Sequence, residues 1–507
     1  MKPLNINGND LTLEELREVC EQSRPVALDP AARSAMERAR AVVEEQLAGN
    51  KIAYAVNTGV GKLSDVRIPP EQIRELQLNL IRSHCVGVGE PLSESETRAM
   101  MLLRANSMAK GHSGVRPLIV ETLCKMLEKG VHPVIPSQGS VGASGDLAPL
   151  AHLAAVLIGE GAAVFSGKTL SGAEAMKAAG VAPVVLEAKE AISLINGTQA
   201  MLAVGALSLL AAETLVDSAD VLGAMSLDAL KGTDAAFDER IHRARPHAGQ
   251  IKSAANLRLM LEGGSAVRES HRDCGRVQDA YSLRCIPQVH GAVRDALAWC
   301  RQVFDIEMNS AVDNPLVFPE AGGKSAIISG GNFHGEPVAF ALDFLALALT
   351  ALAGISERRL ERMVNPALNE GLPPFLAAGA GLNSGFMMAQ VTAAALVSEN
   401  KIYAHPASAD SITTSGNKED YVSMGMTAAI KLKRVIANST NVLAIEAIAA
   451  AQALDFLAPL KSSARIEKAK AAVRKVCPLV DKDRALSGDF ENVAQAIRKH
   501  ALSLALS

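Results

Sequence analysis

The sequence predicts a mostly α-helical protein built around a bundle of long helices. Helix-type patterns and capping signals recur along most of the chain, strand-like segments are few and short, and three long apolar stretches lie in the second half. With 507 residues, the chain is long enough for a large core and for two or three domains.

Helix boundaries are marked most clearly in the first half of the chain. Gly49 is expected to end the second of these helices, and the glycine-containing residues 111–114 are expected to end the third. Strand-like runs are confined to short pieces such as residues 131–135 and 181–186, and each contains a proline. Three pairs of residues are typical of helix starts: Thr12 with Glu15, Asp29 with Pro30, and Ser93 with Glu96.

The apolar stretches cover residues 200–216, 338–355 and 442–460. Each approaches the length of a membrane span, for which about 18 apolar residues is the usual threshold. Alanine dominates over leucine and isoleucine, and acidic residues interrupt each stretch, so no membrane association is expected. A helix that is apolar all round must be buried on all sides. We therefore expect a central bundle, which neighbouring subunits can share. The interrupting residues are Glu213, Asp343, Glu446 and Asp455.

Composition excludes several function classes. The 51 basic and 54 acidic residues nearly balance, so nucleic acid is not an expected partner. The charged run at residues 357–362 is expected to form a solvated helix face. Seven cysteines without a CxxC pair, and histidines without an HExxH motif, imply neither a disulfide framework nor a bound metal. The N-terminus has no apolar signal segment, so we expect a cytoplasmic protein.

Residues 137–150, SQGSVGASGDLAPL, form the most unusual segment. A flexible loop before a helix is one interpretation. A nucleophile elbow requires G-x-S-x-G, but here Gly145 follows Ser144 directly. A phosphate-binding loop requires GxxxxGK followed by Ser or Thr, and this segment has no lysine. A further Gly-Lys pair, at residues 61–62, lacks both the first glycine and the Ser or Thr.

The interpretation that fits these residues best is backbone cyclisation. The amide nitrogen of Gly145 can attack the carbonyl carbon of Ala143 if the loop is tightly bent. Glycine at 145 has no Cβ to block this approach, and Ala143 adds little bulk. Loss of one water closes a five-membered ring, and loss of a second water from Ser144 leaves an exocyclic methylidene. The product is 4-methylidene-imidazol-5-one, an electrophile made from the protein alone.

Residues 139–154, GSVGASGDLAPLAHLA, closely resemble the signature of histidine ammonia-lyase and its phenylalanine and tyrosine relatives. The resemblance implies a fumarase/aspartase-like long-helix fold, a homotetramer whose sites combine residues from several subunits, and no metal. It also implies an N-terminal region, 1–195, that carries the tripeptide and the catalytic Tyr loop, and a helical bundle, 196–507. Seven further stretches match the family in order: 54–59, 83–87, 196–198, 278–284, 313–315, 331–335 and 419–425.

The chemistry explains why such residues are needed. Eliminating ammonia from an amino acid breaks a β C–H bond that is barely acidic, and a general base alone contributes only about 10²–10⁴-fold. An electrophile that bonds the substrate must share the work. The resemblance implies that the substrate amine adds to the methylidene derived from Ser144 and that Tyr54 removes the β-proton. A phenol is a weak acid, so the site must stabilise its anion. A buried, merely hydrogen-bonded tyrosine is the alternative.

The remaining roles also come from the resemblance. Arg284 is expected to bind the substrate carboxylate, because its planar fork pairs with two oxygens; a structural ion pair is the alternative. Asn196 and Gln278 match residues that hydrogen-bond the cofactor and substrate, although Asn196 beside a glycine is also typical of a loop cap. Tyr281 matches a residue that orients the site. Phe333 and Asn332 match the pocket wall and its polar neighbour.

The substrate is expected to be histidine. The family's histidine-specific members carry a Ser-His pair where Ser83-His84 stands, and a Glu where Glu419 stands. Phenylalanine and tyrosine lyases usually have Gln at the second position. Imidazole nitrogens need polar partners, whereas a carboxylate facing a buried phenyl ring would be unpaired. A solvated charged loop around Glu419 is the alternative.

Tyrosine or phenylalanine lyases and 2,3-aminomutases with the same cofactor remain open alternatives. An aminomutase returns the amine to the β-carbon, and the rigidity of the lid around Tyr54 decides between the two outcomes. Three departures from the commonest family pattern bear on packing near Tyr54 and on the electrostatics around Glu419. They are Val60 in place of Phe, Lys418 in place of Gln, and Tyr421 in place of the His that histidine-specific members often have.

Overall fold

The computed structural model describes residues 1–49, 53–320 and 325–506 and separates into two compact units. Unit 1 comprises Met1–Leu207, Arg301–Asp343 and Pro406–Ile430. Unit 2 comprises Ser208–Cys300, Phe344–His405 and Lys431–Ser507. The division after residue 195 stays a prediction, since a compact unit does not by itself define a functional region.

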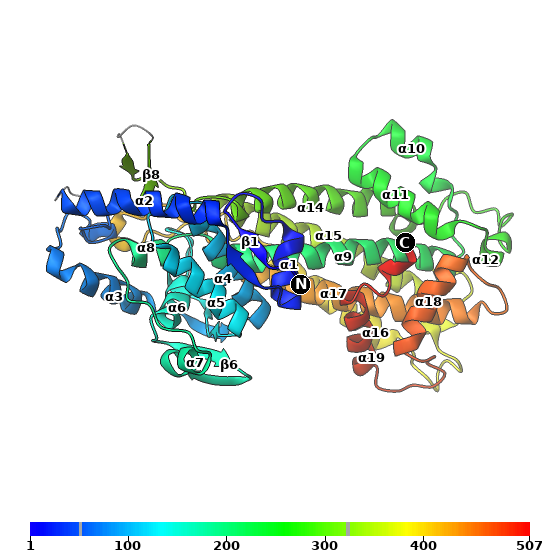
Figure 1. Ribbon diagram of the computed structural model, residues 1–507. Helices are drawn as coiled ribbons and strands as arrows, with labels where there is room; N and C mark the ends of the chain where they lie inside the picture. The colour runs from blue at the N-terminus through cyan, green and yellow to red at the C-terminus, as the bar shows by residue number, and fades with distance from the viewer. Residues whose placement is uncertain (50–52, 321–324, 507) are drawn as a thin grey trace. The chain divides into compact units, whose positions relative to one another are not determined.

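Four long helices dominate the chain and confirm the mostly α-helical class (Figure 1). Each contains a boundary between the two units, so both units are discontinuous in sequence. The second apolar stretch lies wholly inside one of these helices, whereas the third runs past the end of its helix into a turn that contains Pro459. The helices are α9 (Gln199–Ala229), α14 (Ile286–Met308), α15 (Glu336–Val364) and α17 (Gly425–Phe456).

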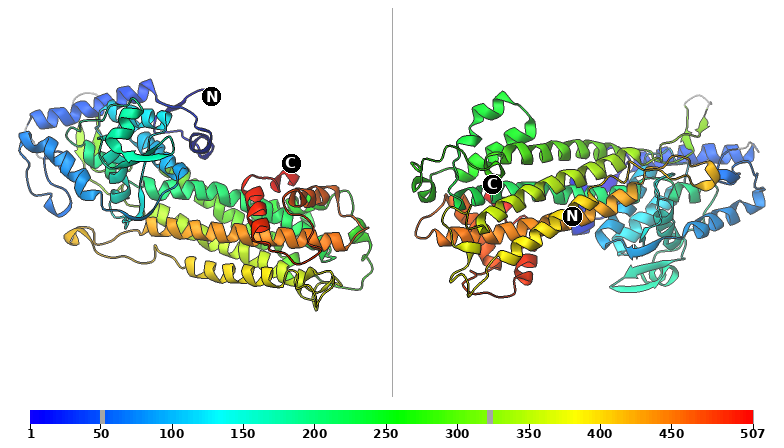
Figure 2. Two further views of the ribbon diagram at one scale, coloured as in Figure 1. Left: turned by 90° about the horizontal axis from the view of Figure 1, so that it is seen from below. Right: turned by 180° about the vertical axis from the view of Figure 1, so that it is seen from behind.

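Within unit 2, buried polar contacts connect the long helices. Asp220 of α9 lies 2.8 Å from His290 of α14, and Ser226 of α9 donates to Glu446 of α17 at 2.7 Å. Arg359 of α15 pairs with the same Glu446 at 2.5 Å. These contacts place segments that are far apart in sequence side by side, as two further views of the chain show (Figure 2).

Unit 1 adds shorter helices to its part of the long ones. Their ends follow the signals in the sequence: Thr12 makes a capping box with Glu15, and Asp29 accepts hydrogen bonds from the first amides of the next helix. The helices are α1 (Leu13–Gln22), α2 (Pro30–Ala48), α3 (Ile73–His84), α4 (Glu94–Ala109), α5 (Pro117–Lys129), α6 (Leu147–Leu157), α7 (Gly172–Ala178) and α8 (Glu190–Ile195), with the 3-10 turns η1 (Gly61–Leu63), η2 (Pro70–Gln72) and η5 (Ser415–Asn417).

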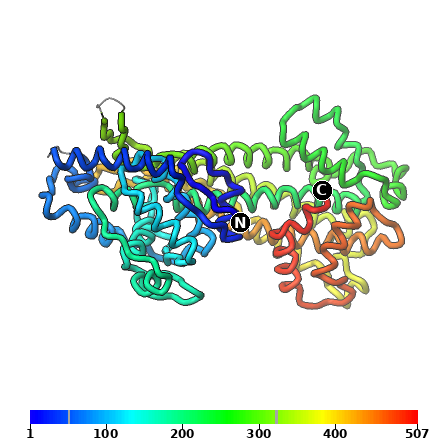
Figure 3. The backbone as a smooth tube through the Cα atoms, viewed as in Figure 1, coloured from blue at the N-terminus to red at the C-terminus, as the bar shows by residue number. Residues whose placement is uncertain are grey.

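Every strand of the described residues lies in unit 1, and each is short. One pair, β1–β2, is parallel, and the others are antiparallel. The hairpin β6–β7 and α7 form an excursion of the chain between α6 and α8 (Figure 3). The strands are β1 (Leu4–Ile6), β2 (Val26–Leu28), β3 (Val88–Pro91), β4 (His132–Pro133), β5 (Pro136–Gln138), β6 (Ala162–Phe165), β7 (Lys168–Ser171), β8 (Leu316–Phe318) and β9 (Ala326–Ile328).

Unit 2 adds shorter helices to its part of the long ones. These are α10 (Glu239–Ala244), α11 (Ala248–Leu261), α12 (Ala266–Glu269), α13 (Tyr281–Arg284), α16 (Met387–Tyr403), α18 (Ala464–Val476) and α19 (Ser487–Arg498), with η3 (Ala235–Phe237), η4 (Pro374–Leu376) and η6 (Ser503–Leu506).

Two local predictions are wrong. Residues 181–186 form no strand, because their amides bond to single carbonyls of neighbouring segments, as Val184 N does to Leu157 O, and proline removes a further donor. The charged run 357–362 is not a solvated face. Glu357 is buried, and Arg359 is fully buried because Glu446 of another helix pairs with it.

Two helices, α9 and α15, are long and apolar enough to cross a membrane. The acidic residues within them therefore do not by themselves exclude a span. However, the most apolar windows of these helices are 78% and 67% buried inside the protein. Burial of this extent is typical of a core helix in a globular protein, which passes the same test of length and composition.

Candidate active site

A cavity of about 1000 Å³ in unit 1 collects most of the residues predicted to be functional. Its wall is built from the turn at residue 54, the end of α3, the loop before α6, the end of α8, and two later loops around residues 330 and 419. The predicted residues that line the cavity are Tyr54, His84, Ala143, Ser144, Asn196, Phe333 and Glu419.

The loop carrying Ala143-Ser144-Gly145 is held bent by its own side chains. Ser140 Oγ donates to Asp146 Oδ1 at 2.8 Å and accepts from Gly142 N at 3.1 Å. Asp146 is fully buried, and burial raises the pKa of its carboxyl to about 6. Its second oxygen accepts from the backbone N–H of Met201 at 2.8 Å. The loop is therefore anchored on both sides of the tripeptide.

Gly145 meets the requirement that cyclisation sets for this position. Its φ is +71°, and a Cβ there would lie 2.1 Å from the carbonyl oxygen of Gly197. Only glycine can occupy such a position without displacing the backbone of its neighbour. The close approach of two chain segments, the tight bend and the small Ala143 together fit a tripeptide that closes on itself.

Tyr54 lies in a tight turn at the cavity wall. Its neighbour Ala55 has φ +55° and donates its N–H to Thr58 Oγ1 at 3.0 Å. The phenol oxygen of Tyr54 accepts a hydrogen bond from the backbone N–H of Gly61 at 3.1 Å. This hydrogen bond fixes the orientation of the phenol group in the cavity wall.

His84 ends α3 with one ring nitrogen already engaged. Nδ1 lies 2.8 Å from the carbonyl oxygen of Leu80, which can only accept, so Nδ1 carries the proton and donates. Nε2 of the neutral ring is then an acceptor. Burial lowers the pKa of His84, although the Leu80 carbonyl and the Glu419 carboxylate oppose that shift. His84 is therefore a neutral, polar group on the cavity wall.

Glu419 meets the tripeptide directly. Ser144 Oγ donates to Glu419 Oε1 at 3.2 Å, and Thr414 Oγ1 donates to the other carboxylate oxygen at 2.7 Å. Thr414 and Glu419 also pair through their backbones. The carboxylate is thus oriented toward the cavity rather than solvated in a charged loop.

Comparison with known proteins agrees with this geometry. A family model described as aromatic amino acid lyase matches residues 11–475. The chain belongs to the aromatic amino acid lyase family. A histidine ammonia-lyase of Koribacter versatilis (strain Ellin345) is 69% identical to it, over 100% of this chain and 99% of the relative.

Solved structures from the family have the same fold. The histidine ammonia-lyase of Trypanosoma cruzi matches with a TM-score of 0.92 and 43% identity, over 99% of this chain and 95% of its own. A tyrosine aminomutase of Streptomyces globisporus matches with a TM-score of 0.94 and 40% identity, over 99% of this chain and 98% of its own. Proteins with a fold similar to this one therefore include both lyases and mutases, so the fold alone does not distinguish the two activities.

Three predicted residues, Gln278, Tyr281 and Arg284, lie in unit 2 and are not among the residues that line the cavity. Tyr281 is 71% exposed, and its ring faces the Arg284 guanidinium at 4.6 Å from the ring centre. Arg284 Nε is buried without a hydrogen-bond partner among the described residues.

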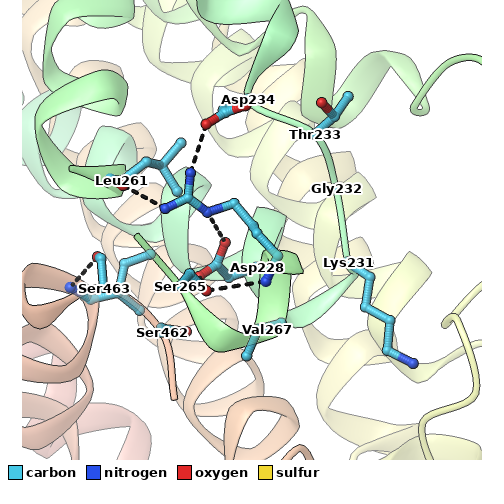
Figure 4. Close-up of polar contacts among 12 residues, drawn as sticks. Asp228, Lys231, Gly232, Thr233, Asp234, Leu261, Ser265, Val267, Ser462 and Ser463 are labelled. Atoms are coloured by element: carbon cyan, nitrogen blue, oxygen red, sulfur yellow. Dashed lines mark hydrogen bonds and ion pairs between the residues drawn. The ribbon is translucent and has the colours of Figure 1, made fainter. Parts of the chain in front are cut away.

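The segment around Gln278 is attached to the turn that follows α9. Thr233 N donates to Asp279 Oδ2 at 2.7 Å, and Arg276 Nε lies 3.2 Å from the other oxygen of the same carboxylate. The Arg268 guanidinium pairs with Asp234 at 2.6 Å and lies 3.4 Å from Asp228. Figure 4 shows both carboxylates, with Leu261, around this guanidinium. The segment that carries Gln278 is thus held by charged contacts.

Asn332 does not line the cavity in the structure. Its side-chain Nδ2 donates to the carbonyl oxygen of Ala311 at 3.3 Å, whereas the adjacent Phe333 reaches the wall. Its role as the polar neighbour stays a prediction. His334 and Tyr421 both line the cavity, and their rings stack with centroids 6.2 Å apart. The sequence assigned no role to His334 and marked Tyr421 only as a departure from the family pattern. Both lie inside matched stretches, and that position was the available signal.

Among residues 1–49, 53–320 and 325–506, no group of three or more His, Cys, Asp or Glu side chains is arranged to hold a metal ion. The seven cysteines, all in the described part of the chain, form no disulfide.

Proposed function

We propose that this chain is a carbon–nitrogen lyase that eliminates ammonia from L-histidine and yields trans-urocanate. The observation that carries the proposal is the approach of Ser144 Oγ to Glu419 Oε1, at 3.2 Å, in a cavity that Tyr54 and His84 also line. Ser144 is the proposed source of the electrophile, and Tyr54 is the proposed base. Glu419 and His84 are polar groups suited to an imidazole ring, and all four residues line one cavity. The names of the histidine ammonia-lyases similar to this chain support the same substrate.

The electrophile is proposed to be 4-methylidene-imidazol-5-one, formed by Ala143, Ser144 and Gly145 without an external cofactor. When formed, this group supplies an electron-poor carbon to the substrate amine. The bend at Ser140, the absence of a Cβ at 145 and the exposure of Ser144 to the cavity fit this group.

The other residues bind the substrate and move its protons. Tyr54, whose oxygen accepts from Gly61 N, removes the β-proton. His84 Nε2 and Glu419 Oε1 each provide an acceptor for an N–H of the substrate ring, which carries one N–H as imidazole and two as imidazolium. His84 Nδ1 and the other carboxylate oxygen of Glu419 are already bonded to the protein. Phe333 contributes an apolar wall and excludes water.

We further propose a cytoplasmic homotetramer in which neighbouring copies complete each site. Gln278, Tyr281 and Arg284 would then come from a partner subunit, where Arg284 binds the substrate carboxylate in a bidentate pair. The unpartnered, buried Nε of Arg284 and the exposed Tyr281 support a role at such a shared site.

A 2,3-aminomutase is the second candidate, because a tyrosine aminomutase is 40% identical to this chain over 99% of its length. It differs from the lyase in the fate of the amine, which returns to the β-carbon. Tyrosine and phenylalanine lyases are the third, and Glu419 argues against them because a phenyl ring leaves that carboxylate unpaired.

Two measurements test the proposal. Intact mass spectrometry should find the purified protein lighter than the encoded chain by two waters, and Ser144→Ala should restore the full mass and abolish activity. Histidine should give urocanate and ammonia in equal amounts, with little product from tyrosine or phenylalanine. A β-amino acid product would replace the lyase with the mutase, and a fully active Ser144→Ala protein would overturn the mechanism.

A further inference from the structure

Lys189 and Asp313 form an ion pair that is completely shielded from solvent. Lys189 Nζ lies 3.1 Å from Asp313 Oδ2, and neither side chain has any exposed area. Two ions without water are costly unless their contacts are good, and removal of only one leaves a buried charge. Lys189 also has φ +71°, a conformation that side-chain-bearing residues rarely adopt. Strain and burial at one lysine indicate a specific role.

The ion pair completes a ring of contacts that includes two residues of the cavity wall, Asn196 and Asn314. Lys189 directly precedes α8, and Asn196 directly follows it. The side-chain Nδ2 of Asn196 donates to the backbone carbonyl of Asn314 at 3.2 Å. Asn314 follows Asp313 in the chain, and the Asp313 carboxylate contacts Lys189, which completes the ring. A donor bond from Lys189 Nζ to Ser193 Oγ, at 2.9 Å, fixes the lysine against α8 itself.

Both asparagines of this ring line the cavity. The side-chain oxygen of Asn314 accepts from Gly330 N at 2.7 Å and from Ser329 Oγ at 3.1 Å, and both of these residues also line the cavity. The ring therefore connects the end of α8 with the loop around residue 330, two parts of the wall that are far apart in sequence.

The ring also decides which atom of Asn196 is available. The carbonyl of Asn314 can only accept, so the amide nitrogen of Asn196 must face it. The side-chain oxygen of Asn196 is buried and has no hydrogen-bond partner among the described residues. The main-chain carbonyl of Asn196 accepts from Arg104 at 2.7 Å, so both ends of the residue are fixed. Asn196, a residue of the cavity wall, therefore keeps one buried acceptor without a partner.

We infer that Lys189 and Asp313 are positioning residues whose ion pair holds Asn196 with its free oxygen toward the substrate. This inference rests on the proposed function, in which Asn196 hydrogen-bonds the reacting group. The ion pair does not touch the substrate and acts through α8 on one side and Asn314 on the other. Arg104 contacts the same residue through the main-chain carbonyl of Asn196. Arg104 is completely buried, and its Nε and one terminal nitrogen have no partner among the described residues.

The test is a double substitution, Lys189→Met with Asp313→Asn. It removes both charges of the pair together, so neither Lys189 nor Asp313 is left as a buried ion without its partner, and it keeps the oxygen that accepts from Asn314 N. The buried Arg104 keeps its hydrogen bonds to Asn196 O and Gln199 Oε1. We expect a folded tetramer that still loses two waters by intact mass. Its kcat should fall about 10²-fold with KM changed less than about threefold, since a misplaced polar group costs this much.

A double-mutant cycle with Asn196→Ala separates positioning from general destabilisation. If the pair acts through Asn196, its removal should cost less than about threefold once Asn196 is already alanine. Additive losses in kcat would overturn the inference. Wild-type kcat in the double variant, with an impaired Asn196→Ala enzyme, would also overturn it while leaving the proposed function intact. An active Asn196→Ala enzyme would instead remove the role proposed for Asn196.

Two further variants complete the design. Arg116→Gln with Glu190→Gln removes another ion pair at the start of α8, 2.6 Å long, that does not contact Asp313. It should lower Tm without changing kcat by more than about twofold. If the Lys189→Met, Asp313→Asn protein does not fold, Asp313→Glu keeps both charges but shifts the carboxylate by one methylene. It should show the same loss of kcat and the same dependence on Asn196, and wild-type kcat in this variant would overturn the inference.

Discussion

Gly145 lies so close to the backbone of Gly197 that position 145 tolerates no side chain. A Cβ on Gly145 would lie 2.1 Å from Gly197 O, and the next amide, that of Asp146, donates to the same oxygen at 2.7 Å. This contact joins the tripeptide loop to the segment that follows Asn196. It makes position 145 a direct test of whether the bent loop is needed.

Gly145→Ala should prevent the loss of two waters and abolish activity, because the added carbon displaces Gly197. Intact mass and histidine turnover check both effects. Gly167→Ala is the matched control, since Gly167 has φ +75° but open space around a Cβ. It should lower stability by about 1–2 kcal/mol and leave mass loss and kcat unchanged. Dehydrated, active Gly145→Ala enzyme would contradict the loop geometry.

Tyr54→Phe should lower kcat for histidine by about 10²–10⁴-fold, the share that a general base contributes. The ring of Phe keeps the packing of the turn but gives Gly61 N no acceptor. KM should change little, and intact mass should still show the loss of two waters. Activity within tenfold of wild type would exclude Tyr54 as the base.

Glu419→Gln should lower kcat/KM for histidine by about 10- to 100-fold, since a hydrogen bond to a charged group is worth about 1.5–3 kcal/mol. The relative rate on tyrosine or phenylalanine should rise, because the unpaired carboxylate is gone. Intact mass should be unchanged from wild type, which separates substrate recognition from formation of the electrophile. An unaltered preference for histidine would show that Glu419 does not select the substrate.

His84 should govern the acid side of the activity profile. Burial lowers its folded-state pKa below the ordinary 6.5, so the ring binds a proton less readily in the fold than in the unfolded chain. Stability should therefore decline as pH falls from about 6.5 toward the lower, folded-state pKa. Histidine binding, which needs the neutral ring of the folded enzyme, should decline as pH falls through that folded-state pKa.

The Glu419 carboxylate raises the pKa of His84, so Glu419→Gln should shift this acid limb to lower pH. Comparison of kcat/KM profiles for the two enzymes on one substrate cancels the titration of the substrate itself. An identical limb in both profiles, or a shift to higher pH, would rule out His84 as the titrating group.

Mixed assemblies test the shared site. Ser144→Ala and Arg284→Ala proteins should each be inactive, yet regain activity when they are unfolded and refolded together. In such mixtures some sites combine an intact tripeptide with an intact Arg284 from another copy. Refolding each variant alone is the control. If both variants are inactive alone and the mixture stays inactive, Arg284 acts within its own chain. An active Arg284→Ala protein refolded alone would show that Arg284 has no role.

Local sequence determined the helix starts and predicted the electrophile. Thr12 with Glu15 and Asp29 with Pro30 act over three or four residues, so their caps could be predicted without knowledge of the fold. The same holds for Ala143-Ser144-Gly145, because cyclisation depends on the size of adjacent residues. The resemblance to the family then supplied the roles of Tyr54 and its partners.

Only the tertiary structure decided which distant residues meet. Ser144 and Glu419 stand 275 positions apart, and Lys189 and Asp313 stand 124 apart. Arg359 was expected on a solvated face, but Glu446 of another helix buries it. A charge is stable in the interior only where a partner is packed against it, and that partner comes from another part of the chain. The local pattern that predicts a helix contains no information about that partner.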